Sequence, residues 1–281
     1  MKHIYLNLKR FDIAPEYGGV NLLAPSGDWA RAVMCSIQKE LEIYDPMEVD
    51  FTVFFPEMHI LSALGARSLF SPVRIGCQGV HWADTEVGGN FGAFTSSRPA
   101  AAMAAAGCEA VLIGHCEERT ALGQVLAEAG VYDSGAVNRL LGREVRCAAA
   151  RGLKILYCIG EKSEEQEHWQ EVLGRQMDIG LSGAEDADIV IGYEPVWSIG
   201  PGKTPADRAY IQKVARFVKE RTNGRDVVYG GGLKQENAAT LASIPELDGG
   251  LIALTRFSGA IGFYPGEYLE IVRRYMDGEQ A

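Results

Sequence analysis

Short apolar runs of strand length recur along the whole chain, and most are continuously hydrophobic rather than alternating with polar residues. Continuous runs of this kind are typical of strands that are covered on both faces, as in a parallel sheet. The predicted strands are His3–Leu6, Val49–Phe55, Val73–Cys77, Ala110–Ile113, Lys154–Ile159, Ile189–Tyr193, Asp226–Tyr229 and Gly250–Leu254.

The segments between these runs indicate how the strands are connected. Each gap except the shortest holds a plausible helix, such as Gly142–Arg151 or Ala206–Arg221. Eight strand-then-helix units without a break in composition predict the α/β fold class, with the strands arranged as a closed parallel (β/α)8 barrel. We expect it to occupy residues 1–281 as a single domain. An open doubly wound sheet is the alternative, but it requires no such even count of eight units.

Two other segments stand out from this regular pattern. Gln78–Ser97, which is rich in Gly, Asp and Thr, is the longest loop-like stretch. A loop of that length inside a compact domain is usually functional. The acidic run Glu161–Glu167 is predicted to lie on the solvated face of a helix.

Composition narrows the classes of partner. The formal net charge of -10 argues against nucleic acid or an anionic membrane as the main partner, and it means that an anionic substrate requires a locally positive site. The six cysteines are scattered, with no C-x-x-C pair and no His/Cys cluster of zinc spacing, so we expect no metal site. The N-terminus lacks the apolar core of a signal peptide, and no apolar run reaches the length of a membrane helix. We therefore expect a cytoplasmic protein with free thiols.

Residues that could take part in catalysis or binding follow several of the predicted strands. Asn7 and Lys9 follow the first strand, Gly114–Glu117 the fourth, Glu194 the sixth and Gly230–Gly232 the seventh. The carboxyl ends of the strands form the active face of barrels of this kind. Taken separately, each signal is modest, since a lysine after a strand is usually a surface residue and glycines also serve tight turns.

Taken together, these residues resemble the triosephosphate isomerase family from one end of the chain to the other and in the same order. The resemblance implies a TIM barrel that interconverts glyceraldehyde 3-phosphate and dihydroxyacetone phosphate without a cofactor. The matching segments are Asn7-Leu-Lys9, Gly92-Ala-Phe-Thr95, Ile113-Gly-His-Cys-Glu117, Cys158-Ile-Gly-Glu161, Ile191-Gly-Tyr-Glu-Pro-Val-Trp-Ser-Ile-Gly-Pro-Gly-Lys-Thr204 and Tyr229-Gly-Gly231.

The resemblance implies a role for each catalytic candidate. Glu194 is the base that removes a proton next to the carbonyl. His115, at a helix N-terminus, is a neutral hydrogen-bond donor that polarises the carbonyl. Lys9 holds the substrate's negative charge and stabilises the enediolate oxygen. Asn7 adds a neutral donor, and Glu117 orients Lys9.

The same resemblance makes Trp197–Thr204 a lid over the site. A closed lid excludes water and protects a labile enediolate. The backbone N–H of Gly200 is expected to meet the substrate phosphate. Gly202 adds mobility, whereas Pro201 removes one N–H at the tip of the lid.

The sequence departs from the family at the phosphate site. Gly232 replaces a serine after the seventh strand, and Ala253 and Leu254 stand where the family has two glycines after the eighth. Gly231 and Gly232 still offer backbone N–H groups to a phosphate. The loop after the eighth strand is longer, and we hypothesise that its Arg256 folds over the pocket and takes part of the phosphate charge. The alternative is that Arg256 is a surface residue of a stabilising loop.

The region that the family uses for dimerisation also differs. In the family, a glutamate after the Gly-Ala-Phe-Thr segment pairs with an arginine of the partner subunit near the histidine motif. Here those positions are Ser97 and Glu118. Both charges have changed, which favours a homodimer with a rebuilt interface, in which Gly92–Thr95 reaches the partner's active site.

Two other functions remain open at this point. The chain could isomerise another small sugar phosphate, for example a tetrulose phosphate, with the enlarged loop shaping the pocket. It could also be a barrel that binds a sugar phosphate without turnover. The joint presence of Lys9, His115 and Glu194 favours an enzyme.

Overall fold

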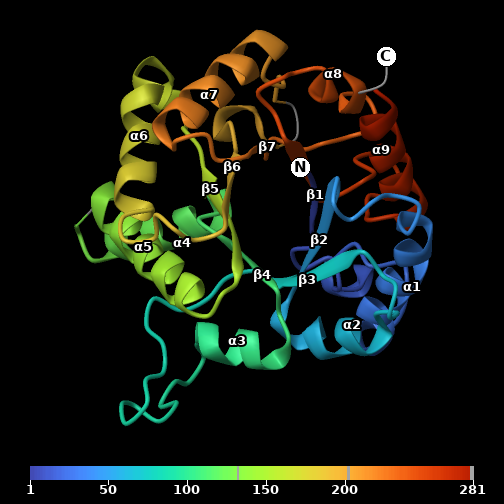
Figure 1. Cartoon of the computed structure of the whole chain (residues 1–281), viewed down its shortest axis with the longest axis horizontal. Coiled ribbons are helices and arrows are strands. Elements are labelled where there is room, and N and C mark those ends of the chain that lie inside the picture. Colours follow the sequence, from blue (N-terminus) through green and yellow to red (C-terminus); the bar gives the residue numbers. More distant parts are fainter. Residues whose placement is uncertain (132, 201–202, 279–281) are drawn as a thin grey trace.

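The computed structural model describes residues 1–131, 133–200 and 203–278. Within them, parallel strands close into a barrel in the order β1 to β8, with helices in a ring outside (Figure 1). The predicted fold class is therefore confirmed. The strands are β1 (Lys2–Asn7), β2 (Val49–Phe55), β3 (Val73–Cys77), β4 (Ala110–Ile113), β5 (Lys154–Ile159), β6 (Ile189–Tyr193), β7 (Val227–Tyr229) and β8 (Gly249–Ile252).

The predicted bounds of β2 to β6 are those observed, and β1 is longer by one residue at each end. The predicted bounds of the last two strands differ from those in the structure. β7 begins at Val227 instead of Asp226, and β8 ends at Ile252 instead of Leu254. The reason for the early end of β8 is local: the backbone of Thr255 and Arg256 turns to hydrogen-bond Gly262, so the chain leaves the barrel for a hairpin.

The helices bury one face each against the barrel. In α1, for example, Trp29, Val33, Ile37 and Leu41 recur at the helical period and are all buried. None of the helices in the described ranges is long and apolar enough to cross a membrane. The helices are α1 (Trp29–Leu41), α2 (Ile60–Ala66), α3 (Ala100–Ala106), α4 (Cys116–Glu128), α5 (Ser134–Ala150), α6 (Trp169–Gly180), α7 (Arg208–Arg221), α8 (Ala238–Ala242) and α9 (Pro265–Asp277).

The two helices for which residue ranges were predicted begin at other residues in the structure. The helix predicted over Gly142–Arg151 is the second half of α5, which begins at Ser134 because the side chain of Asp133 caps it by accepting from the N–H of Gly135. Likewise, α7 begins after Asp207, whose carboxylate accepts from the N–H of Tyr210. Capping residues thus decide where these helices begin.

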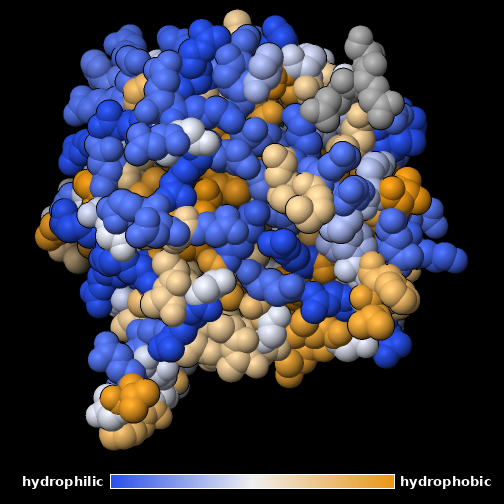
Figure 2. Space-filling view, viewed as in Figure 1, coloured by the Kyte–Doolittle hydropathy of each residue, from blue (hydrophilic) through white to orange (hydrophobic). Residues whose placement is uncertain are grey.

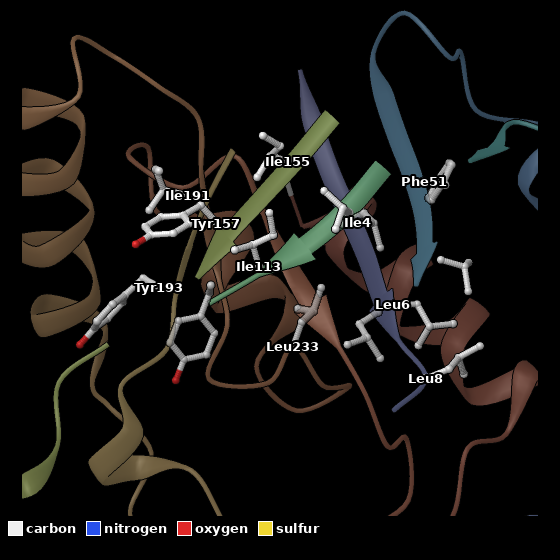
Figure 3. Packing of buried hydrophobic residues seen from close by; sticks show 14 of the residues in the cluster. Ile4, Leu6, Leu8, Phe51, Ile113, Ile155, Tyr157, Ile191, Tyr193 and Leu233 are labelled. Carbon is white, nitrogen blue, oxygen red and sulfur yellow. The ribbon is translucent and has the colours of Figure 1, made fainter. Parts of the chain in front are cut away.

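The core has two layers that follow the alternation of the strands. Ile4 and Leu6 of β1, and Leu8 directly after it, lie in series and belong to the cluster that includes the helices (Figure 3). Tyr5, between them, joins a second cluster whose members all come from strands, which places that cluster inside the barrel. The barrel is therefore a packed core, and its chemistry is confined to its two ends.

The loop between β3 and α3 projects into solvent, and most of its residues are not buried. It projects from the ring of helices at the lower left of Figure 1, as a loop of functional length would. Its tip presents apolar surface (Figure 2), and Val87 and Phe91 are exposed by 109% and 88%. Two large apolar side chains close together on a projecting tip make this loop a candidate contact surface.

Candidate active site

At the carboxyl end of β1 the backbone takes a strained turn that presents Lys9. Lys9 has a φ of +40°, a region that lysine rarely occupies. Its N–H donates to Oδ1 of Asn7 at 3.0 Å, which is how a polar side chain stabilises such a turn. Strain that is held in place by hydrogen bonds is typical of functional sites.

Gln78, directly after β3, holds the same turn from the neighbouring strand end. Its amide Nε2 lies 3.2 Å from Oδ1 of Asn7 and 3.1 Å from the carbonyl oxygen of Lys9. The sequence analysis did not single out Gln78. Its position at the carboxyl end of a strand was a signal that could have found it.

The ammonium of Lys9 faces the carboxylate of Glu117 on α4. Lys9 Nζ donates to Oε1 of Glu117 at 2.6 Å. Burial alone would raise the pKa of Glu117, but the Lys9 ammonium outweighs it and holds this pKa below its usual value. Because Glu117 is 64% exposed, the pair is solvated and can exchange partners when an anion arrives. The structure thus brings Lys9 and Glu117 together as the sequence suggested.

His115 is the N-cap of α4, and its side chain has a defined tautomer. Nδ1 accepts from the N–H of Glu117 at 3.3 Å, so this nitrogen carries no proton. In a neutral imidazole the proton is therefore on Nε2. Nε2 lies 3.2 Å from Oε1 of Glu194 and points as a donor into the mouth of the barrel.

Glu194 follows β6 and is almost fully buried, with 2% exposure. Its Oε2 accepts from the N–H of Cys116 at 2.9 Å, so the N-terminus of α4 holds the carboxylate. Gly230 after β7 lies directly against it, since a Cβ at Gly230 would come within 2.6 Å of the Cγ of Glu194. A glycine is required there because any side chain would displace the carboxylate.

The loop that carries His115 is braced from behind by its own helix. Oε2 of Glu118 accepts from the N–H of Gly114 at 2.6 Å, and Arg119 donates to the carbonyl oxygen of Gly114 at 2.8 Å. Glu118, considered above as part of an altered subunit contact, therefore turns inward and supports the loop of its own chain. Burial and the neighbouring Glu118 raise the pKa of Glu144 to about 10, so that carboxyl remains protonated beside it.

Among the described residues, His115, Cys116 and Glu194 form one group whose ligand atoms lie within 4.8 Å of one another. The chemistry of these donors does not fit a metal. Burial, followed by the charge of Glu194, raises the pKa of the Cys116 thiol well above its usual value. Nδ1 of His115 and Oε2 of Glu194 are already used as acceptors of backbone N–H groups.

The base of the predicted lid is anchored by Glu161, and here the sequence prediction was wrong. Glu161 has no exposure and does not lie on a solvated helix face, whereas Ser163–His168, which follows it, forms a short 3-10 helix without buried residues. Its Oε1 accepts from Trp197 Nε1 at 2.7 Å and from the hydroxyl groups of Tyr193 and Tyr210. These three partners are distant in sequence, so local pattern could not reveal them. Glu161 thereby ties the lid base to β6 and α7.

The lid itself leaves this anchor as an irregular segment. Gly200 is exposed and has a φ of +116°. Pro201 and Gly202 lie outside the described residues. The glycine loop after β7 continues from Gly230, which lies against Glu194, to Gly231 and Gly232.

Arg256 is engaged by residues at the end of its own loop and on α9. Its guanidinium forms an ion pair with Glu267 of α9 and stacks 3.8 Å from the centroid of the Tyr264 ring. The hydrogen bond to Glu267 raises the pKa of Arg256 further. In this structure Arg256 therefore has the alternative role, that of a residue that stabilises the loop.

Comparisons with known proteins agree with this geometry. A family model described as triosephosphate isomerase matches residues 28–260. The triosephosphate isomerase of Halorhodospira halophila is 33% identical over 79% of this chain and 85% of its own, and that of Pseudomonas putida is 33% identical over 81% and 90%. The crystal structure of triosephosphate isomerase from Bartonella henselae matches with a TM-score of 0.71 and 24% identity over 98% of this chain and 99% of that chain, which supports the fold. The chain belongs to the triosephosphate isomerase family and is an isomerase of that type.

Proposed function

We propose that this chain interconverts glyceraldehyde 3-phosphate and dihydroxyacetone phosphate, with Glu194 as the base. The observation that carries the proposal is the contact of Nε2 of His115 with Oε1 of Glu194 at 3.2 Å, beside Lys9 and Glu117. A substrate carbonyl that accepts from Nε2 of His115 would take the place of Oε1. The freed carboxylate oxygen then faces the carbon next to that carbonyl.

The reaction needs only a proton and the electrons of the substrate. Glu194 takes a proton from the carbon next to the carbonyl, and the electrons of that C–H bond form a carbon–carbon double bond. Negative charge develops on the carbonyl oxygen, where Lys9 and His115 stabilise it. Glu194, whose proton exchanges with water, then gives a proton to the neighbouring carbon while the hydroxyl proton moves between the two oxygens, so that no atom is gained or lost.

The phosphate is proposed to lie against the backbone N–H groups of Gly231, Gly232 and Gly200. Gly231 and Gly232 follow β7, where barrels of this kind bind phosphate. Asn7 acts mainly through the Lys9 turn, since its Oδ1 already accepts the Lys9 N–H. We also propose that the whole chain is a single domain and that it works in the cytoplasm. The cysteines in the described ranges are free, which is typical of a reducing compartment.

Steady-state kinetics with a panel of three- to five-carbon sugar phosphates tests this proposal. The expected result is the highest kcat/KM for glyceraldehyde 3-phosphate. A higher kcat/KM for a tetrulose phosphate would replace the proposal by an isomerase of larger sugars. Tight binding without turnover of any sugar phosphate would replace it by a binding protein. No observation on this chain favours either alternative.

We also propose that the chain forms a homodimer through its projecting loop. The loop tip offers exposed Phe91, and a hollow of about 750 Å³ beside the Lys9 turn exposes Tyr17, Leu22 and Met58. A twofold axis would place each tip in the hollow of the partner, so that both apolar surfaces are covered. Arg10, next to Lys9, lines this hollow, which would bring the partner close to the active site.

Light scattering at micromolar concentration tests the dimer. The wild type is expected at twice the chain mass, and Phe91→Asp is expected to shift it towards monomer, because a carboxylate at the tip opposes burial. A monomeric wild type with full activity would contradict the proposal.

A further inference from the structure

At the glycine loop after β7, the proposed phosphate site of this chain has few side-chain donors. Gly232 has no side-chain donor, and Arg256 is engaged with Glu267. The ammonium of Lys9 faces Glu117 at the carbonyl end of the site. A phosphate dianion that loses its water in such a pocket requires compensation, particularly on a protein with a net charge of -10.

Lys234 is held in place next to the glycine loop by its backbone. Its N–H donates to Oδ1 of Asn237 at 2.8 Å, and Nδ2 of Asn237 donates to the carbonyl oxygen of Gly232 at 2.9 Å. The N–H of Leu233 donates to the carbonyl oxygen of Leu251 on β8 at 3.0 Å. The turn is therefore fixed from both sides, and Lys234 cannot move away without breaking it.

The side chain of Lys234 runs back along this loop and passes close to Gly232. Gly232 has a left-handed φ of +100°, and a Cβ there would lie 3.4 Å from Cε of Lys234. Two residues earlier, Gly230 is packed on the side chain of Glu194. An anion on the N–H of Gly232 would therefore lie within reach of the Lys234 ammonium and on the same loop as the base.

The ammonium itself has a ring partner but no acid. Nζ lies 4.0 Å from the centroid of the Phe257 ring. Over residues 1–131, 133–200 and 203–278, no carboxylate forms a salt bridge with Lys234, although the residue is half-buried. A cation on an aromatic face keeps its charge available for an anion on its other side.

The enlarged loop after β8 explains why the ring is there. Arg256 and Gly262 pair as an antiparallel bridge, and the Arg256 guanidinium fastens this hairpin to Glu267 of α9. Phe257 is the next residue. The loop that departs from the family thus supplies a platform for a lysine on the neighbouring loop.

We propose that Lys234 is the phosphate-binding cation of this active site and that Phe257 holds its ammonium in position. The ligand class is a phosphomonoester dianion. This inference rests on the proposed function, because the phosphate concerned is that of the triose phosphate. It assigns to Lys234 the charge that the sequence analysis assigned to Arg256.

Calorimetric titration with inorganic phosphate tests the assignment without requiring turnover. Lys234→Met keeps the apolar stem against Phe257 and removes the charge, Lys234→Arg keeps the charge, and Lys39→Met removes one exposed lysine of α1 as a matched control. Loss of a hydrogen bond to a charged group is expected to weaken phosphate binding about tenfold to a hundredfold in Lys234→Met. Lys234→Arg is expected to keep most of the affinity, and Lys39→Met all of it.

Circular dichroism establishes that each variant is folded, and parallel kinetics separate the two claims. Loss of phosphate binding in Lys234→Met, in a protein that turns over no triose phosphate, would support the assignment and overturn the proposed function. An active wild type whose Lys234→Met variant matches Lys39→Met in phosphate affinity and KM would overturn the assignment and leave the function standing. A wild type that binds no inorganic phosphate would also overturn the assignment.

Discussion

The two ends of the barrel both carry buried charge, but they use it differently. At the amino end, Asp50 of β2 accepts from Lys154 at 2.8 Å, from the Tyr5 hydroxyl at 3.1 Å and from Thr52 at 2.9 Å. His3 lies 3.2 Å from Asp50 and 2.8 Å from Asp226. Burial would raise the pKa of Asp50, yet His3 and Lys154 outweigh it and hold this pKa well below its usual value.

At the carboxyl end the contacts are fewer, and substrate can replace them. Glu194 contacts His115 and one backbone N–H, and Lys9 contacts a carboxylate that is 64% exposed. A fully paired network stabilises the closed barrel, and no ligand can compete for its members. In the site at the carboxyl end, a substrate can replace one partner of each pair and bind the polar group that is left. The two ends thus separate stability from catalysis.

The largest expected effect is on stability, at the amino end. Asp50→Asn should lower the free energy of unfolding by about 3–5 kcal/mol, because it leaves the buried charge of Lys154 uncompensated and removes one of the two carboxylate partners of His3. Urea denaturation followed by circular dichroism measures the change. Asp188→Asn, at a carboxylate that is 68% exposed and 4.0 Å from Lys154, is the matched control and should have little effect. Equal effects of the two substitutions would refute the contrast between the ends.

The next effect is on catalysis, at the carboxyl end. Lys9→Met should reduce kcat/KM by at least 10²–10³-fold, the usual loss when one stabiliser of a developing oxyanion is removed. Its free energy of unfolding should stay near that of the wild type, since the Lys9–Glu117 pair is solvated. Kinetics and urea denaturation of the same preparation measure both quantities. An active or strongly destabilised variant would assign Lys9 to structure instead.

The smallest expected effect is on the pH dependence of stability. Burial lowers the pKa of His3, but its hydrogen bonds to Asp226 and Asp50 outweigh burial and raise this pKa above 6.5. The stability that His3 contributes is therefore complete below pH 6.5 and is lost as the pH rises through the raised pKa of the folded state. His3→Gln should flatten this decline in a series of urea denaturations. Identical slopes for wild type and variant would contradict it.

Much of the fold could be predicted from the sequence, because strands covered on both faces appear as uninterrupted apolar runs. The bounds of β2 to β6 follow directly from that pattern. The end of β8 does not, because Ala253 and Leu254 are apolar but lie where the chain turns into a hairpin. Hydrophobicity reports burial, and it does not distinguish a strand from the loop that follows it.

The candidate site divides in the same way. Lys9, His115 and Glu194 follow strand ends, so the barrel brings them together. Glu161 was assigned an incorrect environment, and the choice between the two interpretations of Arg256 stayed open, because the partners of both residues lie on other elements of the fold. The sequence analysis did not identify Lys234, because the contact of its ammonium with the Phe257 ring depends on a hairpin that no local sequence pattern indicates.

Isomerisation of dihydroxyacetone phosphate in D₂O, followed by NMR, tests the role of Glu194 most directly. A base that exchanges its proton with solvent introduces deuterium at the carbon next to the carbonyl. The wild type is expected to introduce it during turnover, and Glu194→Gln is expected to do so about 10²–10⁴-fold more slowly, the usual contribution of a positioned base. Isomerisation by the wild type without deuterium incorporation, or exchange by Glu194→Gln at the wild-type rate, would contradict the account.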